Sequence, residues 1–394
     1  MAEKKDIWLR ASVVGSLWAS VEIIMGSFFH NLQLPIAGTL LAGFTVVFII
    51  AILQIWPYSG MVWRAGLICA LMKSISPSAV ILGPMTGIFL EALLIELIIF
   101  IFGKNIFAYL IAGAVAVSSA LFHKLITLLI IYGLDTVRIL VNLYHFSAKQ
   151  LNIENISPKD AFYMLIVIYV GFGLLSSLAG YFIGAKAKKI KKQKTVNLSF
   201  SKINNFLVPS DEQKYSVYFL VLNIVFLISG LYLINFFGLV YGSVFVVFYL
   251  IISVLRYKNA FRQFKRPLLW LQLILLTIIS SLFYMENGQV VYFTTKGLIA
   301  GIEMTVRAII VILAFSAISV ELRNPIIRAV LYNKGFANLY DALGLAFSAL
   351  PAIINDVAKP KNIVKKPFES IVNILLFTDS LYTQFVNYEQ DNNN

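Results

Sequence analysis

Apolar runs of about twenty residues, repeated along the chain, restrict its possible folds more than any other feature. An α-helix needs roughly 20 mostly apolar residues to cross the hydrocarbon core of a bilayer. The runs lie at 8–29, 34–56, 61–74, 78–102, 106–133, 161–184, 215–234, 236–255, 267–285 and 295–319. With 59% hydrophobic and 13% charged residues, the chain lacks the polar surface of a soluble domain. We therefore predict an all-α membrane protein of about ten transmembrane helices.

A basic and polar segment divides these runs into two bundles, of six and of four helices. We predict a six-helix membrane domain over 1–184, a linker over 185–214, and a second membrane domain over 215–394. Beyond residue 320 apolar residues are mixed with charged ones, and no uninterrupted apolar stretch is long enough to span. We expect amphipathic helices there, on or near the cytoplasmic membrane surface. One is expected to open at Pro325 and another to cover 337–350 and end at Pro351.

The distribution of positive charge predicts the orientation. The formal net charge is +13, and six lysines of the linker, Lys186, Lys188, Lys189, Lys191, Lys192 and Lys194, lie within nine residues of one another. Lysine and arginine collect in cytoplasmic loops of membrane proteins. We therefore expect a multi-pass protein of the plasma (inner) membrane, with its N-terminus, linker and C-terminus in the cytoplasm. The same clustering favours the lipid bilayer over nucleic acid as the partner of this charge.

Charged side chains inside the predicted spans mark candidate binding residues, because a charge in hydrocarbon needs a partner or a wet cavity. The candidates for substrate binding are Glu22, Glu91, His123 and Lys124. The competing interpretation is structural, with Glu22 or Glu91 paired to Lys124. Glu91 and Glu96 are five residues apart and project about 140° apart around a helix, so they do not form a paired-carboxylate site.

Small residues recur every four positions on the first helix, at Ala11, Gly15 and Ala19. Such a stripe lets another helix approach closely. Its partner is either another helix of the same half or a helix of the second half. In the second half, Glu303 and Arg307 are four residues apart on one helical face, where they can neutralise each other.

Several functional classes lack support in the sequence. The single cysteine, Cys69, excludes an internal disulfide, and no metal-ligand spacing is present, so we expect no metal site. Three scattered histidines do not make a membrane enzyme. A phosphate-binding Gly-x-x-x-x-Gly-Lys-Ser/Thr loop is missing from the sequence, so any ATP hydrolysis must come from another polypeptide.

The arrangement resembles an energy-coupling factor (ECF) transporter, an ABC-type micronutrient importer, with two subunits fused. Residues 1–200 resemble the substrate-binding S component, through six helices, the stripe on the first helix and the Gly83-Pro84-x-x-Gly87 motif. Residues 215–357 resemble the transmembrane T component. The residues that carry this second likeness are Gly297, Gly301, Glu303, Arg307, Pro325 and the Ala-Leu-Pro at 349–351.

This resemblance implies that the S half binds a vitamin or related small molecule outside the cell, and that the T half couples its uptake to two separate cytoplasmic P-loop ATPases. It implies an S–T contact at Ala11, Gly15 and Ala19, and ATPase coupling through Arg323, Arg328 and Lys359. This chain carries no cofactor of its own under this interpretation, since ATP is used by the partners. The chain departs from the family because the two Ala-Arg-Gly-like motifs of T components are absent; Arg328-Ala329 and Ala358-Lys359-Pro360 stand there instead.

The alternative is an ion-coupled secondary transporter, with protons or sodium ions bound by Glu22, Glu91 and Glu96. Such transporters usually show broken helices at matching places of two inverted repeats. The first half has a Gly-Pro break at 83–84, and the second half has no counterpart. The sequence therefore favours the ECF interpretation.

Overall fold

The computed structural model describes residues 2–31, 36–73, 82–150, 155–191, 216–257, 267–283, 285–286, 289–290, 295–321, 337–356 and 367–393. Its first half contains the helices α1 (Ala2–Asn31), α2 (Ala37–Ile55), α3 (Met61–Lys73), α4 (Leu82–Phe102), α5 (Ile106–Tyr132), α6 (Asp135–Gln150) and α7 (Pro158–Lys191). Its second half contains α8 (Val217–Phe237), α9 (Leu239–Arg256), α10 (Pro267–Phe283), the two-residue strands β1 (Met285–Glu286) and β2 (Gln289–Val290), α11 (Thr295–Glu321), α13 (Ala337–Asp356) and α15 (Pro367–Asn393).

Eight helices within the described ranges are long and apolar enough to cross a bilayer: α1, α2, α4, α5, α7, α8, α9 and α11. This confirms the predicted all-α, multi-pass membrane protein. Helices α3 and α10 have 13 and 17 residues, so the predicted total of about ten spans stays a prediction. Large apolar side chains such as Phe100, Val167 and Leu255 are exposed on these helices. Lipid tails are a suitable neighbour for such a surface.

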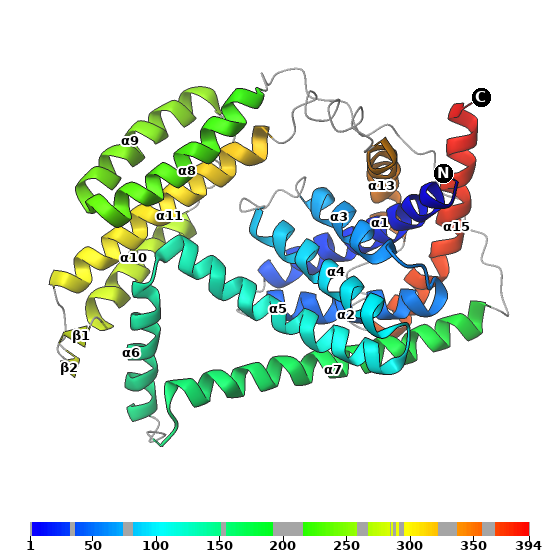
Figure 1. Ribbon diagram of the computed structural model, residues 1–394, viewed down its shortest axis with the longest axis horizontal. Coiled ribbons are helices and arrows are strands. Elements are labelled where there is room, and N and C mark those ends of the chain that lie inside the picture. The colour runs from blue at the N-terminus through cyan, green and yellow to red at the C-terminus, as the bar shows by residue number, and fades with distance from the viewer. Residues whose placement is uncertain are drawn as a thin grey trace.

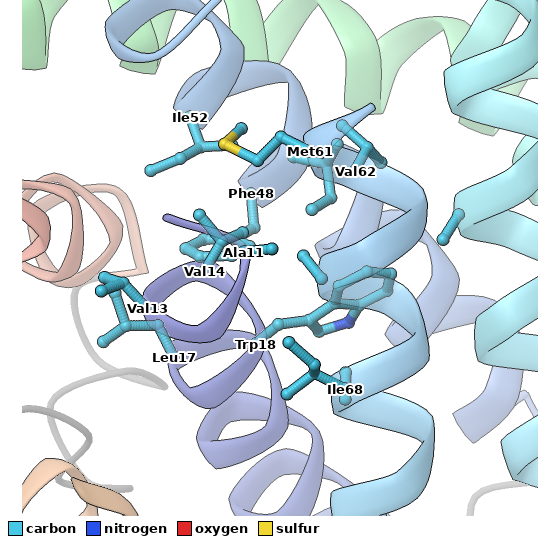
Figure 2. Close-up of a cluster of buried hydrophobic side chains, with 14 of the residues drawn as sticks. Ala11, Val13, Val14, Leu17, Trp18, Phe48, Ile52, Met61, Val62 and Ile68 are labelled. Atoms are coloured by element: carbon cyan, nitrogen blue, oxygen red, sulfur yellow. The ribbon is translucent and has the colours of Figure 1, made fainter. Parts of the chain in front are cut away.

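Helices α1 to α5 and α7 form one bundle, in which α2 and α5 pack along α7, and α3 lies between α1 and α4 (Figure 1). Glycines let these backbones approach each other. A Cβ atom at Gly173 of α7 would lie within 3 Å of the backbone of Gly113 and Ala114 of α5. Figure 2 shows the core around α1, where Trp18 extends beside Ile68 of α3.

The second bundle consists of α8 to α11, with α11 packed against α8, α9 and α10 (Figure 1). The two C-terminal helices lie elsewhere. Helix α13 packs on α1 and α3, and α15 packs on α7, α1 and α2. Their apolar faces are buried against the first bundle, with Ala342 and Ala346 of α13 and Leu375 and Phe385 of α15 among the best-buried residues.

Three local features differ from the sequence-based expectations. The segment between the predicted spans 106–133 and 161–184, for which no helix was predicted, contains the amphipathic helix α6. Helix α7 continues to Lys191, so the first residues of the predicted linker are helical. Helix α13 does not end at Pro351 but continues to Asp356, because proline removes one backbone donor and kinks a helix without forbidding helix on both sides. The helix expected at Pro325 lies outside the described residues.

Candidate functional site

A buried ion pair joins α1 to α3 inside the first bundle. The Nζ atom of Lys73 lies 3.6 Å from Oε2 of Glu22 and donates to the Glu22 backbone carbonyl at 3.0 Å. Thr45 of α2 donates to Oε1 of Glu22 at 3.5 Å, and the Trp18 indole donates to Thr45 at 3.1 Å. Side chains of α1, α2 and α3 therefore form one network around the Glu22 carboxylate. A charged group inside a membrane needs such partners.

The structural interpretation of the sequence paired Glu22 or Glu91 with Lys124, whereas the structure pairs Glu22 with Lys73. Lys124 lies on an exposed face of α5, whereas Lys73 is buried at the C-terminal end of α3. Trp18 and Thr45 were not anticipated as members of this site. The spacing contained a signal for Trp18, because Trp18 and Glu22 are four residues apart and share a face of α1.

Glu91 of α4 lies within electrostatic range of Glu22 and of Cys69. Its side chain is buried, and Oε1 has no hydrogen-bond partner among the described residues. His123 of α5 contacts α4 one helical turn before Glu91, at Thr86 and Gly87. Its Nε2 atom is 2.9 Å from the Thr86 hydroxyl, and its ring lies against Gly87. The structure thus places Glu91 within electrostatic range of Glu22, with His123 one helical turn away and Lys124 on an exposed face of α5.

Glu96 has a structural role at the other end of α4. Its carboxylate accepts hydrogen bonds from the backbone amides of Gly60 at 2.6 Å, Val62 at 2.8 Å and Trp63 at 3.3 Å. These amides belong to the first turn of α3, where N–H groups lack intrahelical partners and an anion is stabilised. The carboxylate therefore caps α3 and is committed to that role.

The small-residue stripe on α1 is fully buried. A Cβ at Gly15 would lie about 2.9 Å from Ala65 and Ile68 of α3, so this glycine serves close packing within the first bundle. The contact of α1 with α13 runs past Lys5, Trp8 and Leu9, which line a small crevice with Asn338, Asp341, Ala342 and Leu345. A contact of Ala11 and Ala19 with the second half stays a prediction.

An aromatic cage around Arg10 attaches α15 to the start of the chain. The Arg10 guanidinium lies 4.4 Å from the ring centroids of Tyr58 and Tyr382, and 5.1 Å from that of Trp56. Its Nε donates to Asp6 at 2.8 Å, and the Tyr382 hydroxyl donates to the other oxygen of Asp6. We call these five residues the Arg10 cage. A hydrogen bond of 3.2 Å from the Trp56 indole to Asp379 adds a second link to α15.

Arg307, in the middle of α11, joins the second bundle to the C-terminal end of α5 in the first. It donates to the backbone carbonyl of Tyr132 at 3.2 Å and to the Asn235 side chain at 2.6 Å. The Tyr132 carbonyl belongs to the last turn of α5, where a cation is stabilised by the helix dipole. Arg307 therefore bonds across the bundles, while Glu303 remains its electrostatic neighbour.

A second buried carboxylate, Glu321, holds together one end of the second bundle. It is 0% exposed and accepts from the Ser216 backbone amide at 2.7 Å and from the Tyr257 hydroxyl at 2.8 Å. Arg256 lies 3.8 Å away. Because Glu321 is the last residue of α11, its carboxylate ties the C-terminal end of this helix to α9 and to the residue before α8. The expected ATPase-coupling residues Arg323, Arg328 and Lys359 follow it and lie outside the described residues.

Comparison of this chain with protein-family models, with curated proteins and with solved structures finds no match.

Proposed function

We propose that this protein is the membrane subunit of an ECF-type importer, with a substrate-binding half and a coupling half in one chain. The first bundle would bind a vitamin or a related small molecule. Residues 215–394 would transmit the action of two separate cytoplasmic ATPases, which consume the ATP. The proposal includes a location in the plasma membrane with both termini in the cytoplasm.

One observation carries the proposal: α13 and α15 belong in sequence to the second half but pack against α1, α2, α3 and α7 of the first. A helix pair that follows one membrane bundle in sequence and packs on the other is suited to transmit movement between them. Glu321 bonds the end of α11 to the second bundle, and the Arg10 cage binds α15 to the first bundle. A coupling device needs both an anchor and a contact with the moving part.

A further argument concerns the contact surface between α1 and α13. Its buried part consists of small and aliphatic side chains, including Ala342 and Ala346, while Lys5, Asn338 and Asp341 line a crevice along the same contact. Interfaces of small residues let helices slide by small distances without leaving a charge unpaired. Such a surface supports relative motion of the two halves better than a network of buried ion pairs does.

The test is purification of the full chain from its native membrane in mild detergent. We expect two P-loop ATPases to copurify in near-stoichiometric amounts. The combined variant Arg323→Ala, Arg328→Ala, Lys359→Ala should lose them. A matched control, Arg138→Ala, Lys149→Ala, Lys159→Ala, removes the same charge from exposed positions on α6 and the start of α7, and should retain them. Wild-type protein that purifies without ATPases and transports in liposomes under an ion gradient alone would refute the proposal.

A second candidate, ion-coupled transport, is favoured by one observation: Oε1 of Glu91, which is within electrostatic range of Glu22, has no hydrogen-bond partner among the described residues. Ion-coupled transporters hold such groups in the membrane interior. Under this candidate, a pH or sodium gradient drives uptake without ATP, and Glu91→Gln abolishes it. Glu96 no longer belongs to the coupling set, because its carboxylate caps α3.

A further inference from the structure

Glu91 is the least compensated charged group among the described membrane residues. It lies near the middle of α4, and its side chain is only 6% exposed. Oε1 finds no donor among the described residues. An ionised carboxylate without a partner in such surroundings costs several kcal/mol, and a neutral one costs far less.

The charges around Glu91 come from each helix that packs nearby. Helix α1 contributes Glu22, which acts on Glu91 directly, and α3 contributes the Cys69 thiol, which lies within electrostatic range of both carboxylates. Helix α5 contributes His123, which lies against Gly87, one turn before Glu91 on α4. Lys73 of α3 reaches this group of residues through its pair with Glu22. Lys73 is committed to Glu22 through two contacts, with its carboxylate and with its backbone carbonyl. Two carboxylates therefore share one ammonium, and the cluster has an excess of one negative charge if both are ionised.

The space around Glu91 restricts what can neutralise it. A Cβ atom added at Gly66 of α3 would lie 2.1 Å from the Cβ of Ala92, the residue next to Glu91, and 3.3 Å from the Trp18 ring. Helices α1, α3 and α4 are thus in close contact at this level. Close packing beside Glu91 favours the smallest neutralising group, a proton, over an organic cation.

We propose that the Glu22–Lys73–Glu91 cluster is a proton-binding site that holds one proton on Glu91 at neutral pH. The proton can be exchanged within the cluster. When the proton moves from Glu91 to Glu22, the O–H bond on Glu91 breaks and one forms on Glu22, so that the net charge of the cluster stays unchanged. The inference goes beyond the proposed function, since it holds whether ATP or an ion gradient drives transport.

Infrared spectroscopy of the full chain in lipid vesicles tests this directly, because a protonated carboxyl has a C=O absorption that shifts in D₂O. We expect this band at neutral pH in the wild type, and its loss in Glu91→Gln. Glu96→Gln is the matched control on the same helix and should keep the band, since Glu96 accepts three amide hydrogen bonds. A band unaffected by Glu91→Gln would overturn the proposal.

Two further variants test the sharing of the ammonium and the position of the proton. Lys73→Met removes the cation, so both carboxyls should be protonated and the band should grow about twofold.

Thr45→Val removes a donor to Glu22 and should leave the band position unchanged, because the proton is on Glu91. A shifted band would place the proton on Glu22. Loss of the wild-type band on adding sodium at constant pH would make a metal ion the ligand. Either result refutes the assignment, and neither depends on the ATPases.

Discussion

The guanidinium of Arg10 lies 4.4 Å from the ring of Tyr382, so a residue of the first helix and a residue of the last helix are in direct contact. The contact is reinforced by Asp6, which accepts from both residues. Cation–π contacts are strengthened when they are shielded from water. The two ends of the chain are therefore held together by side chains and not only by the covalent path between them.

Removal of the Arg10 side chain should loosen α15. Arg10→Ala eliminates contacts with three rings and with Asp6, at a cost of about 1–3 kcal/mol. We expect a lower unfolding temperature in detergent and faster proteolysis within α15. Arg138→Ala is the matched control, because that side chain is 73% exposed on α6. Equal behaviour of the two variants would show that the Arg10 cage does not hold α15.

Tyr257 should make the stability of the second bundle depend on alkaline pH. Burial raises the pKa of the Tyr257 phenol, and its hydrogen bond to the Glu321 carboxylate raises it further. A phenol with a raised pKa in the folded state stabilises that state below its unfolded pKa of about 10, and this stabilisation is lost as the pH rises toward the folded pKa.

The corresponding experiment compares denaturation midpoints from neutral pH to above pH 10. Tyr257→Phe should lose about 1–3 kcal/mol at neutral pH, because its hydroxyl donates to Glu321 and accepts from Asn223, and should show a shallower decline above about pH 10 than the wild type. Tyr241→Phe, at an exposed position of α9, controls for the tyrosine count. Parallel declines in the wild type and Tyr257→Phe would contradict the role of this hydrogen bond.

Two glycines of α7 offer a matched test of helix packing. A Cβ at Gly173 would meet the Gly113 carbonyl oxygen and the Ala114 Cα, whereas a Cβ at Gly171 would have nothing within 4 Å. Gly173→Ala should therefore destabilise the bundle by about 1–3 kcal/mol. Gly171→Ala should be neutral or stabilise by up to about 1 kcal/mol, through the higher helix propensity of alanine. Thermal unfolding in detergent measures both, and a mild effect at Gly173 would place α5 and α7 further apart.

Glu96 should matter for folding rather than for transport. Glu96→Ala leaves three amides of the α3 start without their acceptor, at an expected cost of about 2 kcal/mol. Glu96→Gln keeps one acceptor oxygen and should cost about half as much. Transport per folded molecule should remain near the wild-type value in Glu96→Gln. A variant that folds normally and does not transport would return Glu96 to the functional site.

The sequence alone determined the membrane class and the approximate position of most helices. This was possible because both depend on local properties. A bilayer requires an apolar run of a given length, and a helix satisfies its own backbone hydrogen bonds within that run. Helix α6 was missed because it is amphipathic and too polar to resemble a span, although an apolar residue on every third or fourth position of 135–150 was a usable signal.

Only the tertiary structure decided which charged residues meet. Lys73 rather than Lys124 pairs with Glu22, Glu96 caps a helix that precedes it in the chain, and α13 and α15 rest on the first bundle instead of beside the second. Each of these contacts joins residues far apart in sequence, and their partners depend on how the helices are rotated and stacked. The pattern of apolar residues specifies that a helix crosses the membrane, but the close packing of small residues against neighbouring backbones selects which face it presents.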